Sequence, residues 1–379
     1  MDSHPLSQPD NAIDQPNLLN SPLVLMAPRV DGIEAVWAVS RHSRAYVELE
    51  TANGIRRMIA CDPFGFAPQG DAVIRVRLDD LAPGATYRVR AVTTATDDEE
   101  TVSSNWKTFR TLDPAAPSTH FVAWNDTHQN NAGIQQLNAA TPAADFLVWN
   151  GDTCNDWKDE TELVPTLLNP GGCDISEGRP VFQVWGNHDV RGPHAFRMPS
   201  IVATPEGRPF YAFRSGPVGV ICLHTGEDKP DSHPSFHGRV AFDKLRAEQA
   251  AWLAEVIKRP EIRDAPYRVV FCHIPLRWID EGLQDYAKRG YDRHSGRSRA
   301  AWHDSLVAWG TQLIISGHNH EPIWMPPTEE WPYGQLIGGD REPERATWIE
   351  GTANATELRM RTHNLTGDVL HDLTFPPLV

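Results

Sequence analysis

Five short polar motifs, each placed directly after an apolar run, constrain this 379-residue chain more than any other feature. Each motif carries aspartate, asparagine or histidine, whose oxygen and nitrogen atoms bind divalent cations. In α/β proteins, functional groups gather at the ends of strands that lie far apart in the sequence. The pattern therefore predicts a single metal site built from Asp126-Thr-His128, Gly151-Asp152-Thr-Cys-Asn155, Gly186-Asn187-His188-Asp189, His273 and Gly317-His318-Asn319-His320.

The apolar runs themselves are short and nearly continuous, which is typical of strands that are covered on both faces. We expect such strands at 121–124, 144–149, 180–185, 218–223, 267–272 and 312–316. One clear amphipathic helix is predicted over 242–258, ended by Pro260. Two alternating segments around Thr366-Gly-Asp368 predict a C-terminal hairpin. Long loops that wall the site are expected at 153–179, 190–217, 225–241 and 274–300.

The first third of the chain has a different pattern. Between 23 and 112, apolar residues alternate with polar ones, as Ile74, Val76 and Leu78 do with two arginines. Period-2 alternation interrupted by turn residues predicts antiparallel strands and a β-sandwich. The expected divisions are a flexible tail over 1–20, a sandwich over 21–113, a linker over 113–118 and an α/β domain over 118–379.

The segment from Leu81 to Tyr87 resembles the turn that leads into a late strand of fibronectin type III domains. This resemblance implies that the Tyr87 hydroxyl bonds to nearby backbone. The N-terminal unit is therefore expected to be an all-β, fibronectin type III-like sandwich.

Asp152 is the natural bridge between two metal ions, because each of its carboxylate oxygens can hold one. Such ions lie about 3.5–4 Å apart and need nitrogen or oxygen ligands on both sides. We expect the first ion to be held by Asp126, His128 and His320, and the second by Asn187, His273 and His318. A water on such a site is acidified from a pKa of ~15.7 toward neutrality, and the resulting hydroxide attacks an electrophile in line. A phosphoester is the electrophile that fits this chemistry.

Three further residues are candidates for catalysis. His188 follows a ligand and is placed to protonate the leaving group or to stabilise equatorial charge. Asp189 is expected to orient His188. Arg191 is expected to bind a non-bridging phosphate oxygen, although an arginine after a turn is often simply solvated.

The ordered set of motifs resembles the calcineurin-like metallophosphoesterase superfamily over residues 118–379. The resemblance implies an α/β fold, a four-layer αββα sandwich with the metals at the strand ends, and the ligand roles given above. With a β-sandwich in front, the arrangement is similar to purple acid phosphatases and to bacterial proteins of that architecture. Purple enzymes, however, carry a tyrosine where this chain has Asn155, and lack His128. A non-purple centre with Mn, Fe, Zn or a mixture is therefore expected.

Charge and composition limit the classes of substrate and the cellular compartments that are expected. A formal net charge of −15 disfavours a nuclease, which needs a basic footprint, so a small phosphoester substrate is expected and nuclease activity is the alternative. No apolar run reaches the ~18 residues of a membrane span. The N-terminus lacks the features of a signal peptide, which predicts a cytoplasmic protein, or a periplasmic or secreted one if that terminus is incomplete. Five cysteines favour a reducing compartment, yet Cys154 and Cys173 can still pair.

Three alternatives remain open at this stage. The first is the choice between phosphomonoester and phosphodiester substrates. Arg191, Lys229, His294 and Arg297 could supply positive charge for the dianionic phosphate of a monoester, while the long loops leave room for the second ester arm of a diester. A non-catalytic binding protein with a structural metal would be expected to have lost some ligands, and none is lost. Finally, Trp124, Trp149 and Trp185 each precede a candidate ligand. They could form an aromatic wall that stacks a base or sugar, or they could be ordinary core residues.

Overall fold

The computed structural model describes residues 17–51, 54–58, 64–277 and 296–378. Its largest sheet has nine strands, in the order β21 (Val369–Phe375), β20 (Leu358–Asn364), β19 (Thr347–Ala353), β10 (Thr119–Trp124), β11 (Phe146–Asn150), β12 (Val181–Val184), β1 (Val24–Met26), β2 (Ile33–Ala38) and β6 (Val73–Leu78). A second sheet has the order β13 (Tyr211–Ser215), β14 (Val218–Leu223), β15 (Tyr267–Cys272), β16 (Leu313–Ser316), β18 (Gly334–Ile337) and β17 (Ile323–Met325).

These two sheets pack face to face through a core of aromatic and branched side chains. Phe121 of β10 stacks on Phe146 of β11 at 5.4 Å between ring centroids, and meets the edge of Phe271 from β15 at 6.0 Å. The central strands of each sheet are covered by the other sheet on one face and by helices on the other. Both faces are therefore apolar, which explains the continuous apolar sequence of these strands.

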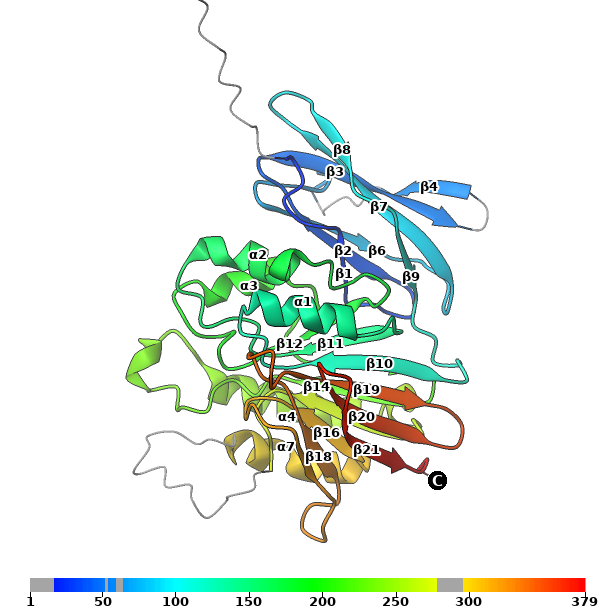
Figure 1. Ribbon diagram of the computed structural model, residues 1–379, viewed down its shortest axis with the longest axis vertical. Helices are drawn as coiled ribbons and strands as arrows, with labels where there is room; N and C mark the ends of the chain where they lie inside the picture. The colour runs from blue at the N-terminus through cyan, green and yellow to red at the C-terminus, as the bar shows by residue number, and fades with distance from the viewer. Residues whose placement is uncertain (1–16, 52–53, 59–63, 278–295, 379) are drawn as a thin grey trace, which may run out of the picture.

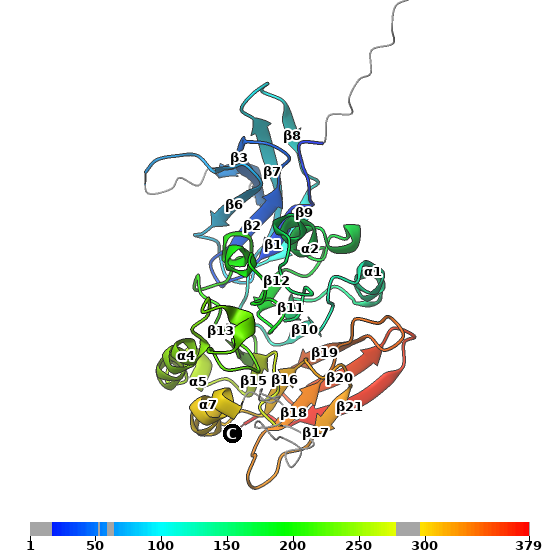
Figure 2. The same ribbon diagram turned by 90° about the vertical axis from the view of Figure 1, so that its left-hand side faces the viewer.

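Helices cover the outer faces of both sheets, as Figures 1 and 2 show. The nine-stranded sheet is covered by α1 (Asn131–Ala140), α2 (Leu163–Leu168) and α3 (Met198–Ile201), which share its outer core. The six-stranded sheet is covered by α4 (Phe242–Val256), α5 (Pro260–Arg263) and α7 (Gly296–Trp309). The layers therefore run helix, sheet, sheet, helix, which confirms the predicted αββα sandwich.

The N-terminal strands form a sandwich of their own at one end of the molecule (Figure 1). Its outer sheet has the order β4 (Gly54–Met58), β3 (Ser43–Thr51), β7 (Thr86–Ala95) and β8 (Thr101–Ser103), with β5 (Gln69–Gly70) beside β3 and β9 (Lys107–Arg110) beside β7. The Tyr87 hydroxyl accepts a hydrogen bond from the Ala82 amide at 2.9 Å, which confirms the contact expected of this turn. The fibronectin type III-like assignment itself remains a prediction.

The inner sheet of this sandwich is continuous with the nine-stranded sheet. β1 pairs with β12 in parallel at Met26 and Val181, and its other edge pairs with β2. Hydrogen bonding therefore crosses the expected boundary at 113–118, and the division into 21–113 and 118–379 stays a prediction.

Several sequence-based expectations are corrected by the structure. Residues 1–16 of the predicted tail lie outside the described residues, but Leu18 is fully buried and Leu19 bridges Val39, so 17–20 are not a flexible tail. Helix α4 ends at Val256, and Pro260 begins α5 instead of ending α4.

The segments predicted as loops contain short helices and one strand. The range 153–179 contains α2 and the 3-10 turns Glu160–Glu162 and Pro170–Gly172, and 190–217 contains Ala195–Arg197, α3 and β13. A further 3-10 turn, Pro234–Phe236, lies in 225–241. Of the segment 274–300, residues 278–295 lie outside the described residues, and α7 begins at Gly296.

Cys154 and Cys173 are free thiols, so the possible disulfide between them is not formed. Cys61 lies outside the described residues. In the part of the chain that the structure describes, no helix is long and apolar enough to cross a membrane.

A buried ion pair joins the N-terminal sandwich to the rest of the fold. Lys107 of β9, whose side chain is 4% exposed, contacts the Asp174 carboxylate and the Ser176 hydroxyl. The same hydroxyl accepts a hydrogen bond from the Leu25 amide of β1 at 3.1 Å. Burial lowers the pKa of Lys107, and the charge of Asp174 opposes that shift.

We predict that Asp174→Asn destabilises the protein by ~3–5 kcal/mol, because it leaves the Lys107 ammonium buried without a counter-charge. The measurement is urea unfolding followed by far-UV circular dichroism. The double variant Lys107→Met, Asp174→Asn serves as control and is expected to recover most of the loss. Equal stability of the single variant and the unmodified protein would show that this pair does not hold the two parts together.

Candidate metal centre

The five sequence motifs meet at one edge of the two central sheets. Three of them follow β10, β11 and β12, which are parallel neighbours in the nine-stranded sheet. The other two follow β15 and β16, which are parallel neighbours in the six-stranded sheet. Because the carboxyl ends of parallel strands share an edge, side chains from five distant segments come together there. The structure thus brings together Asp126, His128, Asp152, Asn187, His188, His273, His318 and His320.

The backbone at this edge is strained. Five of the candidate ligands have left-handed backbone, with φ of 55° at Asp126, 45° at His128, 51° at Asp152, 72° at His318 and 58° at His320. Such conformations are uncommon for residues other than glycine, and they concentrate at functional sites. The surrounding strands hold these residues in an unfavourable conformation that directs their side chains toward one point.

Two glycines allow the motif segments to approach each other closely. A Cβ atom at Gly151, which has φ of 88°, would lie 2.6 Å from the His273 Nδ1 atom. A Cβ atom at Gly186 would lie 2.2 Å from the Asp152 amide nitrogen. Any side chain at either position would therefore push a candidate ligand out of place.

One group of ligand atoms belongs to Asp126, His128 and His320. The two imidazole Nε2 atoms lie 3.1 Å apart, and the His320 Nε2 atom is 3.4 Å from the Asp126 Oδ1 atom. The Asp126 carboxylate is fully buried and is fixed by the His318 amide, which donates to its two oxygens at 3.0 and 2.9 Å. A hydrogen bond to Asp126 and its charge raise the pKa of His320.

A second group belongs to Asp152, His273 and His318. The His273 Nε2 atom is 3.1 Å from the Asp152 Oδ2 atom, and the His318 Nδ1 atom is 2.9 Å from the Asn187 side-chain oxygen. Burial, with His273 next in effect, lowers the pKa of His318 to about 4, so this ring is neutral at pH 7 and offers a lone pair.

The surroundings of His273 require a cation. Its Nδ1 atom lies 2.8 Å from the Asn150 carbonyl and must donate to it, which leaves Nε2 buried without a hydrogen-bond partner. That atom faces the carboxylates of Asp152 and, at 3.7 Å, Asp126. Burial lowers the pKa of His273, but the two carboxylates outweigh it and raise the pKa to about 10. Either a proton or a metal ion must stand between these groups, and the donor set fits a metal ion.

His188 lies beside the ligands and has a partner that the sequence did not reveal. Its ring and that of His128 are 4.9 Å apart, and its Nδ1 atom is 2.7 Å from the Asp156 Oδ1 atom. Burial raises the pKa of Asp156, and the hydrogen bond and charge of His188 more than reverse that effect. Asp156 itself has φ of 75°. No spacing rule singles it out, and only the folded loop brings its carboxylate to the ring.

The structure gives Asp189 partners other than the His188 ring. Both Asp189 oxygens are used inside the fold: one accepts from the Thr153 amide at 3.0 Å and the other from the Gly186 amide at 2.8 Å. This fully buried carboxylate therefore connects two ligand-bearing loops. The His188 ring, which it was expected to orient, is instead bonded by Asp156.

Arg191 reaches the site but is already paired. Its guanidinium lies 3.2 Å from the His188 Nε2 atom and binds both oxygens of the Glu227 carboxylate. Burial raises the pKa of Glu227, and Arg191 opposes the shift. Lys229 pairs with Asp228 at 2.6 Å. These carboxylates were missed by sequence reasoning, because the charge run 227–229 resembles an ordinary solvated loop.

Other candidates are distant or structural. Arg297 pairs with Asp243 at 3.4 Å, and His294 lies outside the described residues. Another carboxylate missed from the sequence is that of Asp340, which is 1% exposed and lies 3.9 Å from the His320 Nδ1 atom.

Comparisons with known proteins agree with this geometry. A model of the calcineurin-like phosphoesterase family matches residues 119–322, more than half of the chain. The chain belongs to the calcineurin-like phosphoesterase family. The family match confirms the resemblance drawn from the motifs, and its bounds contain all seven candidate ligands and His188.

Two curated relatives match part of this chain. The serine/threonine-protein phosphatase CPPED1 of Homo sapiens is 27% identical over 168 residues, which is 43% of this chain and 48% of that protein. The protein of the same name from Pongo abelii is 28% identical over 169 residues, with the same shares. The match spans about half the length of these relatives.

Solved structures of two phosphatases share the fold. The purple acid phosphatase PPD1 from yellow lupin (Lupinus luteus) seeds superposes with a TM-score of 0.69 at 13% identity, covering 96% of this chain and 75% of that one. The structure of PhoD superposes with a TM-score of 0.60 at 11% identity, covering 94% and 88%. At these identities the likeness concerns the fold alone, and it supports the αββα architecture that carries the site.

We predict that Mn²⁺ at about one hundred times its dissociation constant stabilises the metal-free protein by ~2.7 kcal/mol. Asp152→Asn is expected to abolish the rise in Tm, because it removes the negative charge of the proposed bridging ligand. The asparagine side-chain oxygen can still accept the hydrogen bond from the His188 amide, so the local structure is expected to be kept. Thermal unfolding of each variant with and without Mn²⁺ is the measurement. His237→Ala, an exposed histidine, is the matched control. Equal Mn²⁺-induced shifts in all three proteins would remove Asp152 from the metal site.

Proposed function

We propose that this protein hydrolyses small phosphoric esters at a centre of two divalent cations bridged by Asp152. The convergence of buried carboxylates and imidazoles at five strand ends, with His188 beside them, is the observation that carries the proposal. Family membership supports the reaction class. The ligand-type residues are all present, which argues against a non-catalytic protein that retains only a structural metal.

The ligand groups divide naturally between two ions. Asp126, His128 and His320 would hold the first, and Asn187, His273 and His318 the second, with one oxygen of Asp152 for each. Bound divalent cations would lower the pKa of water from ~15.7 toward neutrality and polarise a phosphoryl oxygen. The site lacks a tyrosine at position 155, where Asn155 instead donates to the His128 carbonyl at 2.8 Å. Manganese, iron and zinc, alone or mixed, all suit these ligands.

His188 is the proposed proton donor to the leaving group. Asp156 accepts from its Nδ1 atom, which turns the ring so that Nε2 faces the site beside Arg191. A carboxylate behind an imidazole fixes its tautomer and stabilises its protonated form. His188 can then deliver a proton from Nε2 to the departing oxygen as the ester bond breaks.

Arg191 is proposed to act on the substrate together with His188. Its NH1 group is near the Nε2 atom of His188, while its remaining nitrogens are held by Glu227 and Asp228. The carboxylates fix the guanidinium in place and reduce its net charge. We therefore assign it to positioning a phosphate oxygen and not to supplying most of the neutralising charge.

The overall charge favours a small substrate over a nucleic acid. The net charge of −15 gives no general attraction for a polyanion. Monoesters and diesters both fit, and paired assays with aryl phosphate mono- and diesters on the metal-loaded protein distinguish them.

We predict that His188→Gln lowers kcat/KM for an aryl phosphate by roughly 10²–10⁴-fold, the usual contribution of a positioned acid. Metal content, measured by mass spectrometry of the purified variant, is expected to stay at the level of the unmodified protein. Unchanged turnover with full metal content would show that His188 is not the proton donor.

We predict that Asp156→Asn lowers kcat/KM for an aryl phosphate by roughly 10–100-fold, because the His188 ring loses the charged hydrogen-bond partner of its Nδ1 atom. The measurement is kcat/KM, with metal content determined on the same samples. Asp189→Asn is the control: it weakens the loops that carry Thr153 and Gly186 and lowers Tm, but is expected to lower kcat/KM less. The reverse pattern in the two variants would return the orienting role to Asp189.

A further inference from the structure

A cavity of about 740 Å³ opens beside the metal centre. It adjoins the segment that carries Asn187 and His188, because Trp185 before that motif and the residues from Val190 to Pro193 after it all line the cavity. Its volume falls within the range of small-molecule sites, roughly 300–1,000 Å³. The metal ligands themselves do not line it, so it is a separate compartment of the same site.

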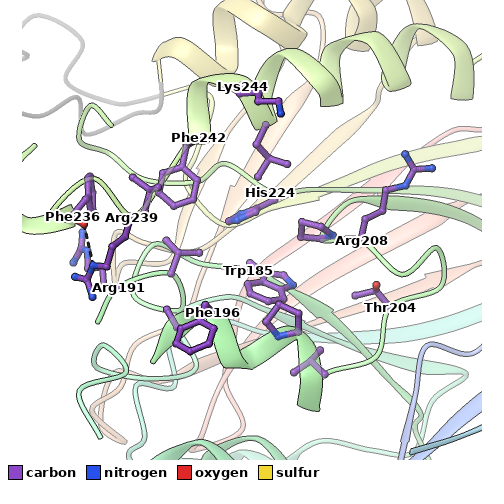
Figure 3. A pocket seen from close by; sticks show the side chains of 18 of the residues that line it. Trp185, Arg191, Phe196, Thr204, Arg208, His224, Phe236, Arg239, Phe242 and Lys244 are labelled. Carbon is purple, nitrogen blue, oxygen red and sulfur yellow. Dashed lines mark hydrogen bonds between the residues drawn. The ribbon is translucent and has the colours of Figure 1, made fainter. Parts of the chain in front are cut away.

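Aromatic rings form the walls of this cavity (Figure 3). The ring centroids of Trp185 and His224 lie 5.8 Å apart, and those of His224 and Phe242 lie 5.9 Å apart. Burial, with Arg246 adding to the effect, lowers the pKa of His224 to about 3, so this wall carries no charge. Phe196, on the other side in Figure 3, is 74% exposed. Hydrophobic and aromatic side chains are the usual lining of a small-molecule site.

Trp185 differs from the two tryptophans that precede other ligands. Trp124 and Trp149 are fully buried, and their indole N–H groups donate to Thr141 at 2.9 Å and to Thr127 at 3.1 Å. Both are ordinary core residues. Trp185 is 7% exposed and lies among the cavity side chains in Figure 3, yet its Nε1 atom has no hydrogen-bond partner. A buried indole N–H is usually paired, so this one is available to an acceptor on a ligand.

The charge of the lining is opposite to that of the whole protein. One acidic residue, Glu248, and five cationic residues line the cavity: Arg75, Arg191, Arg208, Arg239 and Lys244. Four of the cations make ion pairs with carboxylates. Arg239 is the exception among the described residues, because its guanidinium bonds only to the backbone carbonyls of Phe236 at 3.0 Å and Ser235 at 3.5 Å. It is exposed and keeps its full positive charge.

Arg191 joins the cavity to the proposed proton donor. It lines the cavity and lies 3.2 Å from the His188 Nε2 atom, the atom that faces the leaving group. Arg191 therefore lies between the proposed proton donor and the cavity. In Figure 3, Arg191 and Arg239 lie at the same end of the cavity, and Arg208 lies at the other.

We propose that this cavity is the subsite for the leaving group, and that it selects a fused-ring or similarly extended aromatic alcohol that carries a second anionic substituent. The inference rests on the proposed function. The aromatic walls bury the rings, the Trp185 N–H donates to an acceptor, and the Arg239 guanidinium pairs with the anionic substituent.

The test compares phenyl phosphate, 2-naphthyl phosphate and 6-carboxy-2-naphthyl phosphate on the metal-loaded protein. These esters have leaving groups of similar acidity, so differences in KM report binding. We expect the carboxylated ester to have the lowest KM. In Arg239→Gln, its KM is expected to rise about tenfold relative to that of 2-naphthyl phosphate, which corresponds to one charged hydrogen bond. In Phe196→Ala, KM for both naphthyl esters is expected to rise relative to phenyl phosphate.

Arg44→Gln and Phe66→Ala are the matched controls, since both residues lie in the N-terminal part, outside the cavity lining. Neither is expected to change any KM. Identical KM ratios in all variants would overturn the subsite even if every ester is hydrolysed.

A second measurement does not depend on turnover. Calorimetry of 6-hydroxy-2-naphthoate with the metal-free protein is expected to show one site, weakened about tenfold in Arg239→Gln. Naphthoate binding without hydrolysis of any ester would contradict the proposed function but keep the cavity as an aromatic-anion site. Hydrolysis of phenyl phosphate with no naphthoate binding would contradict the subsite and leave the proposed function standing. Naphthoate binding without a change in KM ratios would also overturn the assignment to the leaving group.

Discussion

The structure depends on a concentration of buried negative charge that requires a cation between its carboxylates. Two buried carboxylates, Asp126 and Asp152, face the unpartnered Nε2 atom of His273. Buried carboxylates without compensation cost several kcal/mol each. The strained left-handed backbone at five candidate ligands adds to that cost. Divalent cations held between these groups would offset this cost when they bind.

The scaffold explains how such a site is held in place. Its ligands come from the ends of strands in two sheets, and the sheets are fixed against each other by an aromatic core. Outside the ligands, a ring of supporting contacts holds the loops: Asp189 ties the second motif to the third, Asp156 orients His188, and Glu227 holds Arg191. Each support is a buried or half-buried carboxylate. The acidity of the chain is thus partly explained by the need to fix cationic and N–H groups around the centre.

Much of this could be predicted from the sequence, because the relevant signals are local. Strands β14 and β15 coincide with the predicted runs 218–223 and 267–272, since strands buried on both faces are continuous apolar segments. Helix α1 was missed because only Gly133, Ile134 and Leu137 of its ten residues are buried, which leaves little periodicity. The pairing of β1 with β12 was missed because it joins residues more than 150 positions apart.

The candidate ligands could be predicted from the sequence, but the residues that support them could not. Ligand residues follow strands directly, so their convergence is a consequence of topology. The positions of Asp156, Glu227 and the unpaired indole N–H of Trp185 depend on how irregular loops fold, and no periodicity encodes that. Asp189 was assigned to His188 because it is next in sequence, yet adjacent residues after a turn point in different directions. The cavity beside Trp185 was likewise hidden, because its lining comes from several segments between 75 and 248.

The most direct measurement of the central claim is anomalous diffraction from crystals of the protein loaded with Mn²⁺. The account predicts two anomalous peaks about 3.5–4 Å apart, one on each side of the Asp152 carboxylate. A single peak remote from Asp152, or no peak at saturating Mn²⁺ in a folded crystal, would contradict it.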